Sequence, residues 1–330
     1  MFMPPLLIAF IVTALAFDFL NGFHDSANIV ATMISSRAMS PRRALLLSAV
    51  AHFAAPFLFG VAVATTIGHE VVQPHANTMA VVLAALPAAI AWNLLTWFFG
   101  IPSSSSHALV GGLIGAAIVG YGIGAVQPRG LTKVVIALLL SPPVGLLSGY
   151  ILMKLVLFLA RGASPRINWF FKRAQTLTAL ALALSHGTND AQKTMGIITM
   201  GLVGAGALTQ FRVPWWVVAA SAGAISLGTA MGGWRIIRTL GGRFYKIRPV
   251  HGFTAQATSA AVILGAALLG GPVSTTQVVS SAILGVGSAE RLSKVRWGVA
   301  GNILTTWLLT IPASGLLAAL AYTVVRHIVV

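Results

Sequence analysis

The sequence predicts an all-α polytopic membrane protein of about ten transmembrane segments, arranged as two inverted-topology repeats with broken or re-entrant helices. Three observations lead to this prediction. Of the 330 residues, 57% are hydrophobic and only 8% are charged, whereas soluble domains carry roughly 25% charged residues. The apolar residues come in runs of roughly 17 to 25, the length of a helix that crosses a bilayer. A polar motif built on Gly-x-x-Asp occurs once in each half of the chain.

The first half, residues 1–160, is predicted to form one transmembrane repeat. Its first helix begins at about Pro5 and is expected to break at the polar motif 21–28, because a glycine and several polar groups stand in an apolar run. Further apolar runs predict helices over about 44–66, 79–100 and 131–160. A serine-rich segment beginning at Pro102 opens another apolar run that reaches about residue 121.

The second half repeats this order after a basic linker, residues 161–174, which is predicted to be cytoplasmic. The second repeat covers residues 175–330 and begins with a helix over about 175–202 that carries the second polar motif. Apolar runs then predict helices over about 214–233 and 253–269. A second hydroxyl-rich segment after Pro272 opens a run to about 287, and the last helix covers about 297–322.

The basic residues explain how the two halves are oriented. The net charge of +16 comes from short Lys and Arg clusters between apolar runs, as expected for cytoplasmic loops and not for a nucleic-acid surface. If these clusters are placed on the cytoplasmic side, the chain makes ten crossings with both termini outside. Each motif and its copy then have opposite orientations in the membrane. Inverted repeats with broken helices are typical of secondary transporters. The predicted setting is therefore a lipid bilayer, with its anionic headgroups as partners.

The two hydroxyl-rich segments predict an anion site. Proline is favoured in the first turn of a helix, and the free N–H groups and dipole of such a turn attract anions. Two inverted copies could hold one small tetrahedral anion, although Ser and Thr also pack membrane helices together. The predicted anion ligands are Ser104, Ser105, Ser106, Ser274, Thr275 and Thr276.

The two motif carboxylates, Asp25 and Asp190, predict cation binding beside that anion. A bare carboxylate would repel an anion in a medium of low dielectric constant, so each must be protonated, paired or bridged by a cation. Neutral oxygens for a cation are predicted from Asn28, Asn189 and Gln192, and His24 can titrate next to Asp25. Lys193, three residues after Asp190, could pair with it or contact the anion.

The motifs 22–28 and 185–195, with the two hydroxyl-rich segments, resemble the inorganic phosphate transporter (PiT) family over essentially the whole chain. The resemblance implies symport of phosphate with sodium or protons in the bacterial inner membrane. It also implies possible carriage of a divalent metal with the phosphate, and no resident cofactor or metal. His24 and Lys193 replace amide residues of the sodium-coupled branch, which favours protons. The alternatives are a sulfate permease of the same fold, a channel, and a membrane metalloenzyme using His24, Asp25, His186 and Asp190. The sequence leaves a homodimer open.

Overall fold

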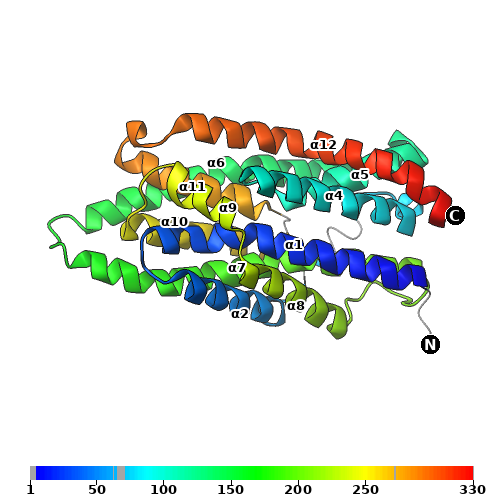
Figure 1. Ribbon diagram of the computed structural model, residues 1–330, viewed down its shortest axis with the longest axis horizontal. Coiled ribbons are helices and arrows are strands. Elements are labelled where there is room, and N and C mark those ends of the chain that lie inside the picture. The colour runs from blue at the N-terminus through cyan, green and yellow to red at the C-terminus, as the bar shows by residue number, and fades with distance from the viewer. Residues whose placement is uncertain (1–4, 62, 65–70, 271–272, 330) are drawn as a thin grey trace.

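The computed structural model describes residues 5–61, 63–64, 71–270 and 273–329, and its elements are helical because the apolar runs satisfy their backbone groups internally. The long helices lie along one axis of an elongated bundle (Figure 1). No strand longer than an isolated bridge occurs within the described ranges. The helices are α1 (Pro5–Ser35), α2 (Pro41–Phe59), α4 (Met79–Phe99), α5 (Ser105–Tyr121), α6 (Pro128–Leu159), α7 (Ile167–Gly204), α8 (Trp215–Met231), α9 (Trp234–Arg238), α10 (Pro249–Leu268), α11 (Thr275–Glu290) and α12 (Trp297–Val329).

Five of the described helices are long and apolar enough to cross a membrane, and α8 with the bent segment that follows it raises this number to six. The five are α1, α2, α4, α6 and α12. This result confirms a helical protein with several membrane-spanning segments. The number of ten crossings stays a prediction.

The polar motif 21–28 does not break its helix, and the expectation of a break there was wrong. Both α1, with 31 residues, and α7, with 38, run through their motifs without interruption. The glycine of each motif serves packing instead. A Cβ at Gly22 would lie 2.1 Å from the Ile225 carbonyl oxygen of α8, and one at Gly187 would lie 3.0 Å from His52 of α2. The glycines therefore let α1 and α7 approach neighbouring helices closely.

The chain breaks where the two hydroxyl-rich segments stand. Residues 100–104 separate α4 from α5, and the α10–α11 connection ends at residue 274; Pro272 of this connection lies outside the described residues. The helices α5 and α11 begin near the middle of the bundle and run toward opposite ends (Figure 1). Each break thus places a helix N-terminus deep inside the protein.

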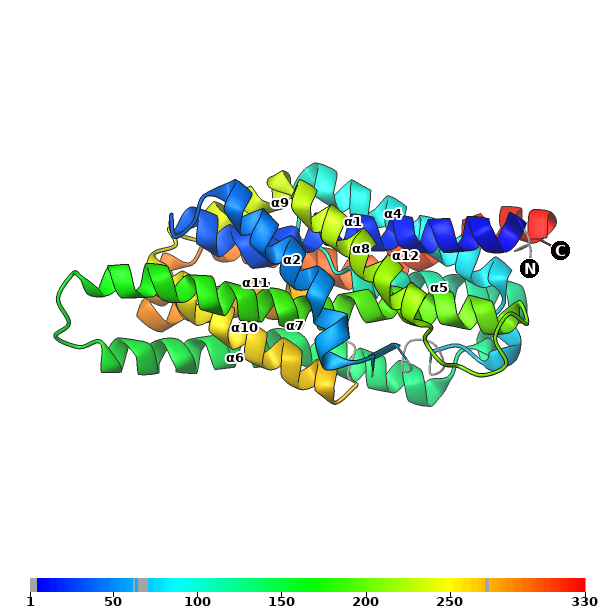
Figure 2. The same cartoon turned by 90° about the horizontal axis from the view of Figure 1, so that it is seen from below.

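The two ends of the molecule differ in charge. The α6–α7 connection lies at the far left of Figures 1 and 2, whereas α1 begins and α12 ends on the right. The connections that carry the basic clusters, α1–α2, α6–α7 and α11–α12, all lie at the left (Figure 1). We call this the basic end. The helix α7 already begins at Ile167, so the predicted linker is a short turn followed by the first turns of α7.

Candidate functional site

The centre of the site is the meeting point of two helix N-termini, those of α5 and α11. Ser104 accepts a hydrogen bond from the backbone N–H of His107 (3.2 Å), and Ser274 does the same for Gln277 (3.3 Å). The two N-cap hydroxyls are also hydrogen-bonded to each other, with 2.8 Å between their oxygens. Because both helix dipoles point their positive ends at this place, it favours negative charge.

Asp25 of α1 lies against both N-termini. Its Oδ1 accepts a hydrogen bond from Thr276 Oγ1 at 3.0 Å, and its Oδ2 accepts one from Ser105 Oγ at 3.3 Å. The Nδ1 atom of His24 lies 2.9 Å from Oδ1. All four side chains are buried. The carboxylate of Asp25 is thus held by one hydroxyl from each half of the chain.

Asp190 of α7 lies on the other side and carries a fixed positive partner. Lys193 forms an ion pair with its Oδ1 and also donates a hydrogen bond to Ser106 Oγ at 2.6 Å. Thr275 Oγ1 donates to Asp190 Oδ2 at 3.0 Å. Lys193 is one of the largest fully buried side chains among the described residues. A buried ammonium needs such partners, because its transfer out of water costs on the order of several kcal/mol.

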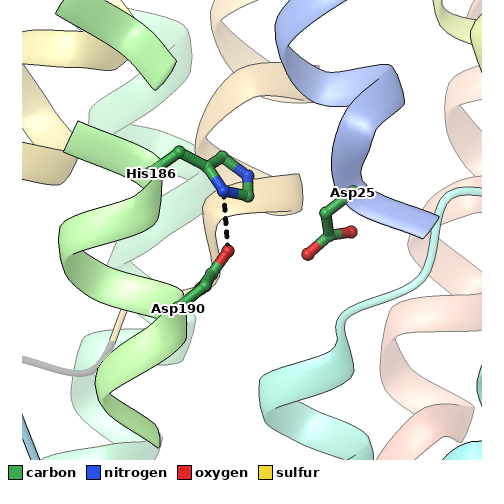
Figure 3. Close-up of side chains that lie close together, drawn as sticks. All are labelled: Asp25, His186 and Asp190. Atoms are coloured by element: carbon green, nitrogen blue, oxygen red, sulfur yellow. Dashed lines mark ion pairs between the residues drawn. The ribbon is translucent and has the colours of Figure 1, made fainter. Parts of the chain in front are cut away.

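His186 lies close to both carboxylates and contacts that of Asp190. Its Nδ1 lies 2.8 Å from Asp190 Oδ2 (Figure 3), and its Nε2 lies 3.4 Å from the amide nitrogen of Asn28. Since an amide nitrogen only donates, Nε2 acts as the acceptor, and Nδ1 of the neutral ring carries the proton that faces Asp190. One ligand atom each from Asp25, His186 and Asp190 lie within 4.8 Å of one another. We call these three residues the carboxylate–histidine cluster.

The structure brings nearly all sequence-predicted site residues together. Ser104, Ser105, Ser106, Ser274, Thr275, Thr276, His24, Asp25, Asp190, Lys193 and Asn28 make the contacts described above, Asn28 also donating to Thr276 Oγ1 at 3.0 Å. Asn189 is buried in α7 beside Asp190. Gln192 lies elsewhere, because its Oε1 accepts from the backbone N–H of Val63 (2.6 Å) and its Nε2 donates to Gly60 O (2.7 Å). It satisfies the irregular backbone that follows α2, a requirement inside a membrane.

Two residues of the site were not among the predicted ligands. Asn21 accepts a hydrogen bond from Ser105 Oγ at 2.6 Å through its side-chain oxygen, and His186 contacts Asp190 and Asn28. Both carried a signal in the sequence. Asn21 precedes Asp25 by four residues, and His186 precedes Asp190 by four, so each lies on the same helix face as its carboxylate.

The comparisons with known proteins agree with one another. The profile described as "Phosphate transporter family" matches residues 21–165 and 160–318. The chain is 48% identical over 327 residues to a "Probable low-affinity inorganic phosphate transporter" of Bacillus subtilis, with 98% of each chain covered. It is 46% identical to a Rhizobium meliloti protein of the same description, with 96% of each covered. A solved structure described as "The sodium-dependent phosphate transporter" superposes with a TM-score of 0.88 at 26% identity, covering 98% of this chain and 100% of that one.

Proposed function

The chain belongs to the phosphate transporter family, and on that premise we propose that it imports inorganic phosphate across the bacterial inner membrane by symport with protons, with sodium as the alternative ion. The transporter names of its relatives favour this proposal over an enzyme. They offer no support for the sulfate permease. The proposed site comprises the hydroxyls of the α5 and α11 N-termini for phosphate and the carboxylates of α1 and α7 for the coupling ion.

The order of elements supports two inverted repeats as the framework of transport. The series α1, α2, α4, α5, α6 is followed by α7, α8, α10, α11, α12. Packing is exchanged between the halves, since α5 packs on α12 and α11 packs on α6, while α1 packs on α8 and α2 on α7. The charge bias supports a cytoplasmic position for the basic end. In this arrangement one half can rock against the other around the central site.

The observation that carries the coupling is that the phosphate hydroxyls are bonded to the cation carboxylates. Thr276 donates to Asp25 and Thr275 donates to Asp190, while Ser105 shares its one hydroxyl proton between Asp25 and Asn21. In this state the hydroxyl protons point at oxygens of the protein and not at an anion. A proton or sodium ion on the carboxylates would take over that charge and free the hydroxyls to donate to phosphate. Each ligand therefore prepares the site for the other, which is the condition for symport.

The charge of the site also supports binding of the coupling cation before the anion. With the histidines neutral, Asp25, Asp190 and Lys193 sum to −1, and the excess charge lies on Asp25 because Lys193 is paired with Asp190. An anion approaching this centre is repelled until one further positive charge arrives. The Nδ1 atom of His24, 2.9 Å from Asp25 Oδ1, places an imidazole at that point. Lys193 already occupies the position of a cation beside Asp190. These two side chains favour protons over sodium as the coupling ion.

A metal–phosphate complex is a second candidate cargo, favoured by the carboxylate–histidine cluster. Two carboxylates and an imidazole within 4.8 Å are suitable ligands for a divalent cation. The hydroxyls of the adjacent N-termini would then contact the phosphate of the complex. Labelled divalent metal taken up only in the presence of phosphate would support this cargo, and phosphate uptake that is unchanged in metal-free medium would exclude it.

The experiment that tests the proposal is uptake of labelled phosphate by purified protein in lipid vesicles, with proton and sodium gradients imposed separately. Uptake against a phosphate gradient that collapses with a protonophore supports proton symport. Flux that only follows the membrane voltage would identify a channel instead. Excess sulfate should not compete. Asp25→Asn and Asp190→Asn should each abolish coupled uptake, with membrane insertion as the control, and normal transport by both would remove the carboxylates from the mechanism.

A further inference from the structure

A third acidic side chain, Asp18, lies on the same face of α1 as the site. The polar residues Asp18, Asn21, Asp25 and Asn28 follow one another at intervals of three and four, which keeps them on one side of a helix. Asp18 precedes Asp25 by two turns, or about 10 Å along the axis. It therefore lies on the side of the site that faces the end where α1 begins (Figure 1).

The surroundings of Asp18 provide no compensation for a negative charge. The side chain is fully buried, and neither carboxylate oxygen has a hydrogen-bond partner among the described residues. Thr194 of α7 is close enough for its hydroxyl to act as a weak donor to the Asp18 carboxyl, although the two groups do not reach the geometry of a regular hydrogen bond. The described charged groups that act on Asp18 are Asp190, which repels its charge, and Lys193, which attracts it. Lys193 is already bound to Asp190 and Ser106.

A carboxylate in such a place has to bind a positive charge. The idealised cost of moving an isolated carboxylate from water to a medium of low dielectric constant is on the order of 20 kcal/mol. Asp18 avoids this desolvation penalty only if its carboxyl carries a proton or coordinates a small cation. The Thr194 hydroxyl supplies a second oxygen for either species. Two buried oxygen groups from facing helices, neither in a regular hydrogen bond among the described residues, are suitable ligands for a small cation.

The second half of the chain has no equivalent of this group. Seven residues before Asp190, in the position that Asp18 holds relative to Asp25, α7 carries Ala183. The feature thus exists on one side of the central site only.

We propose that Asp18 and Thr194 form a separate binding site for the coupling cation, a proton or sodium ion, between the central site and the end of the protein where α1 begins. This inference rests on the proposed symport. In it, the cation reaches Asp18 before the central carboxylates, and its arrival lowers the barrier for the phosphate that follows.

The test compares wild-type protein, Asp18→Asn and Asp18→Glu in vesicles, with labelled phosphate uptake measured over series of external pH and sodium concentration. Asp18→Asn is expected to weaken the apparent affinity for the coupling cation about tenfold or more, while phosphate binding to the detergent-solubilised protein changes little. Asp18→Glu should restore part of the cation dependence. Superimposable pH and sodium profiles for wild type and Asp18→Asn would overturn the proposal.

Two further outcomes are distinguished by the same series. Wild-type uptake that depends on neither cation would refute the proposed symport itself, independently of Asp18. If Asp18→Asn fails to insert, Thr194→Val replaces it, because this change removes the second oxygen and keeps the carboxyl. Weakened cation affinity in Thr194→Val supports the site, and an unchanged profile overturns it.

Discussion

Gly22 is where the contact between α1 and α8 can be tested most directly. An alanine there would place its Cβ 2.1 Å from the carbonyl oxygen of Ile225 and 2.9 Å from its carbonyl carbon. Ordinary carbon–oxygen contacts are about 3.3 Å, so the two backbones would have to separate by roughly 1 Å. Backbone atoms cannot turn aside as a flexible side chain would. Overpacking of this kind costs about 1–3 kcal/mol, against a gain of about 1 kcal/mol from replacing a helical glycine.

Transport should fall more than stability does. Asp25 lies one helical turn after Gly22, so a shift of α1 moves the carboxylate away from Ser105 and Thr276. A displacement of about 1 Å in a binding constellation can cost on the order of 10²-fold in rate. Thermal unfolding in detergent and phosphate uptake in vesicles measure the two effects.

Gly223 provides the matched control within α8. A Cβ at Gly223 has no neighbour within 4 Å, so Gly223→Ala should transport normally and unfold at an equal or higher temperature. Gly187→Ala, whose Cβ would lie 3.0 Å from Ala55 and His52, should be intermediate. Gly22→Ala protein that matches Gly223→Ala in unfolding temperature and uptake would refute the packing role of the motif glycine.

Three further predictions concern charge and capping. Lys193→Asn should make uptake more dependent on sodium, because Asp190 loses its fixed cation and has to recruit another; a sodium titration that matches the wild type contradicts this. Ser274→Ala should cost about 1 kcal/mol of stability by removing the α11 N-cap and should raise the Michaelis constant for phosphate, which uptake kinetics will measure. At the basic end, burial alone would raise the pKa of Glu290, but Lys294, His251 and Arg248 overcome burial and lower its pKa from 4.5 to about 2. Because the pKa of Glu290 is lower in the folded protein, its ionised form stabilises the fold at neutral pH, and this stabilisation is lost as the pH falls from about 4.5 toward 2. The difference in unfolding temperature between wild type and Glu290→Gln should therefore shrink over that interval.

Much of the fold was predictable because each long membrane helix corresponds to an uninterrupted apolar run in the sequence. The predicted run over 79–100 corresponds to α4, and the run over 131–160 corresponds to α6. The expected break at the polar motif 21–28 was wrong, because a glycine in a helix can permit close packing as well as end the helix. Whether it does so depends on the presence of a neighbour such as α8, which no local pattern reveals.

The sequence predicted which residues belong to the candidate site better than it predicted which of them are hydrogen-bonded to each other. Duplicated motifs identified both carboxylates and both sets of hydroxyls. The crossed hydrogen bonds, by which Ser105 from the first half and Thr276 from the second both hold Asp25, depend on how the halves meet. The position of Gln192 shows the same limit. It lies in the motif, but its amide serves the backbone at Gly60 and Val63.

The sequence by itself determined that this chain is a helical membrane protein of the phosphate transporter family, because hydrophobic length, the positions of positive charge and duplicated polar motifs are properties of residue order. Only the tertiary structure decided that the helices α1 and α7 pass unbroken through their motifs, that Ser104 and Ser274 meet at two opposed helix N-termini, and that Asp18 has no hydrogen-bonding partner among the described residues. Those features arise from contacts between segments more than 100 residues apart, where distance along the chain says nothing about distance in space.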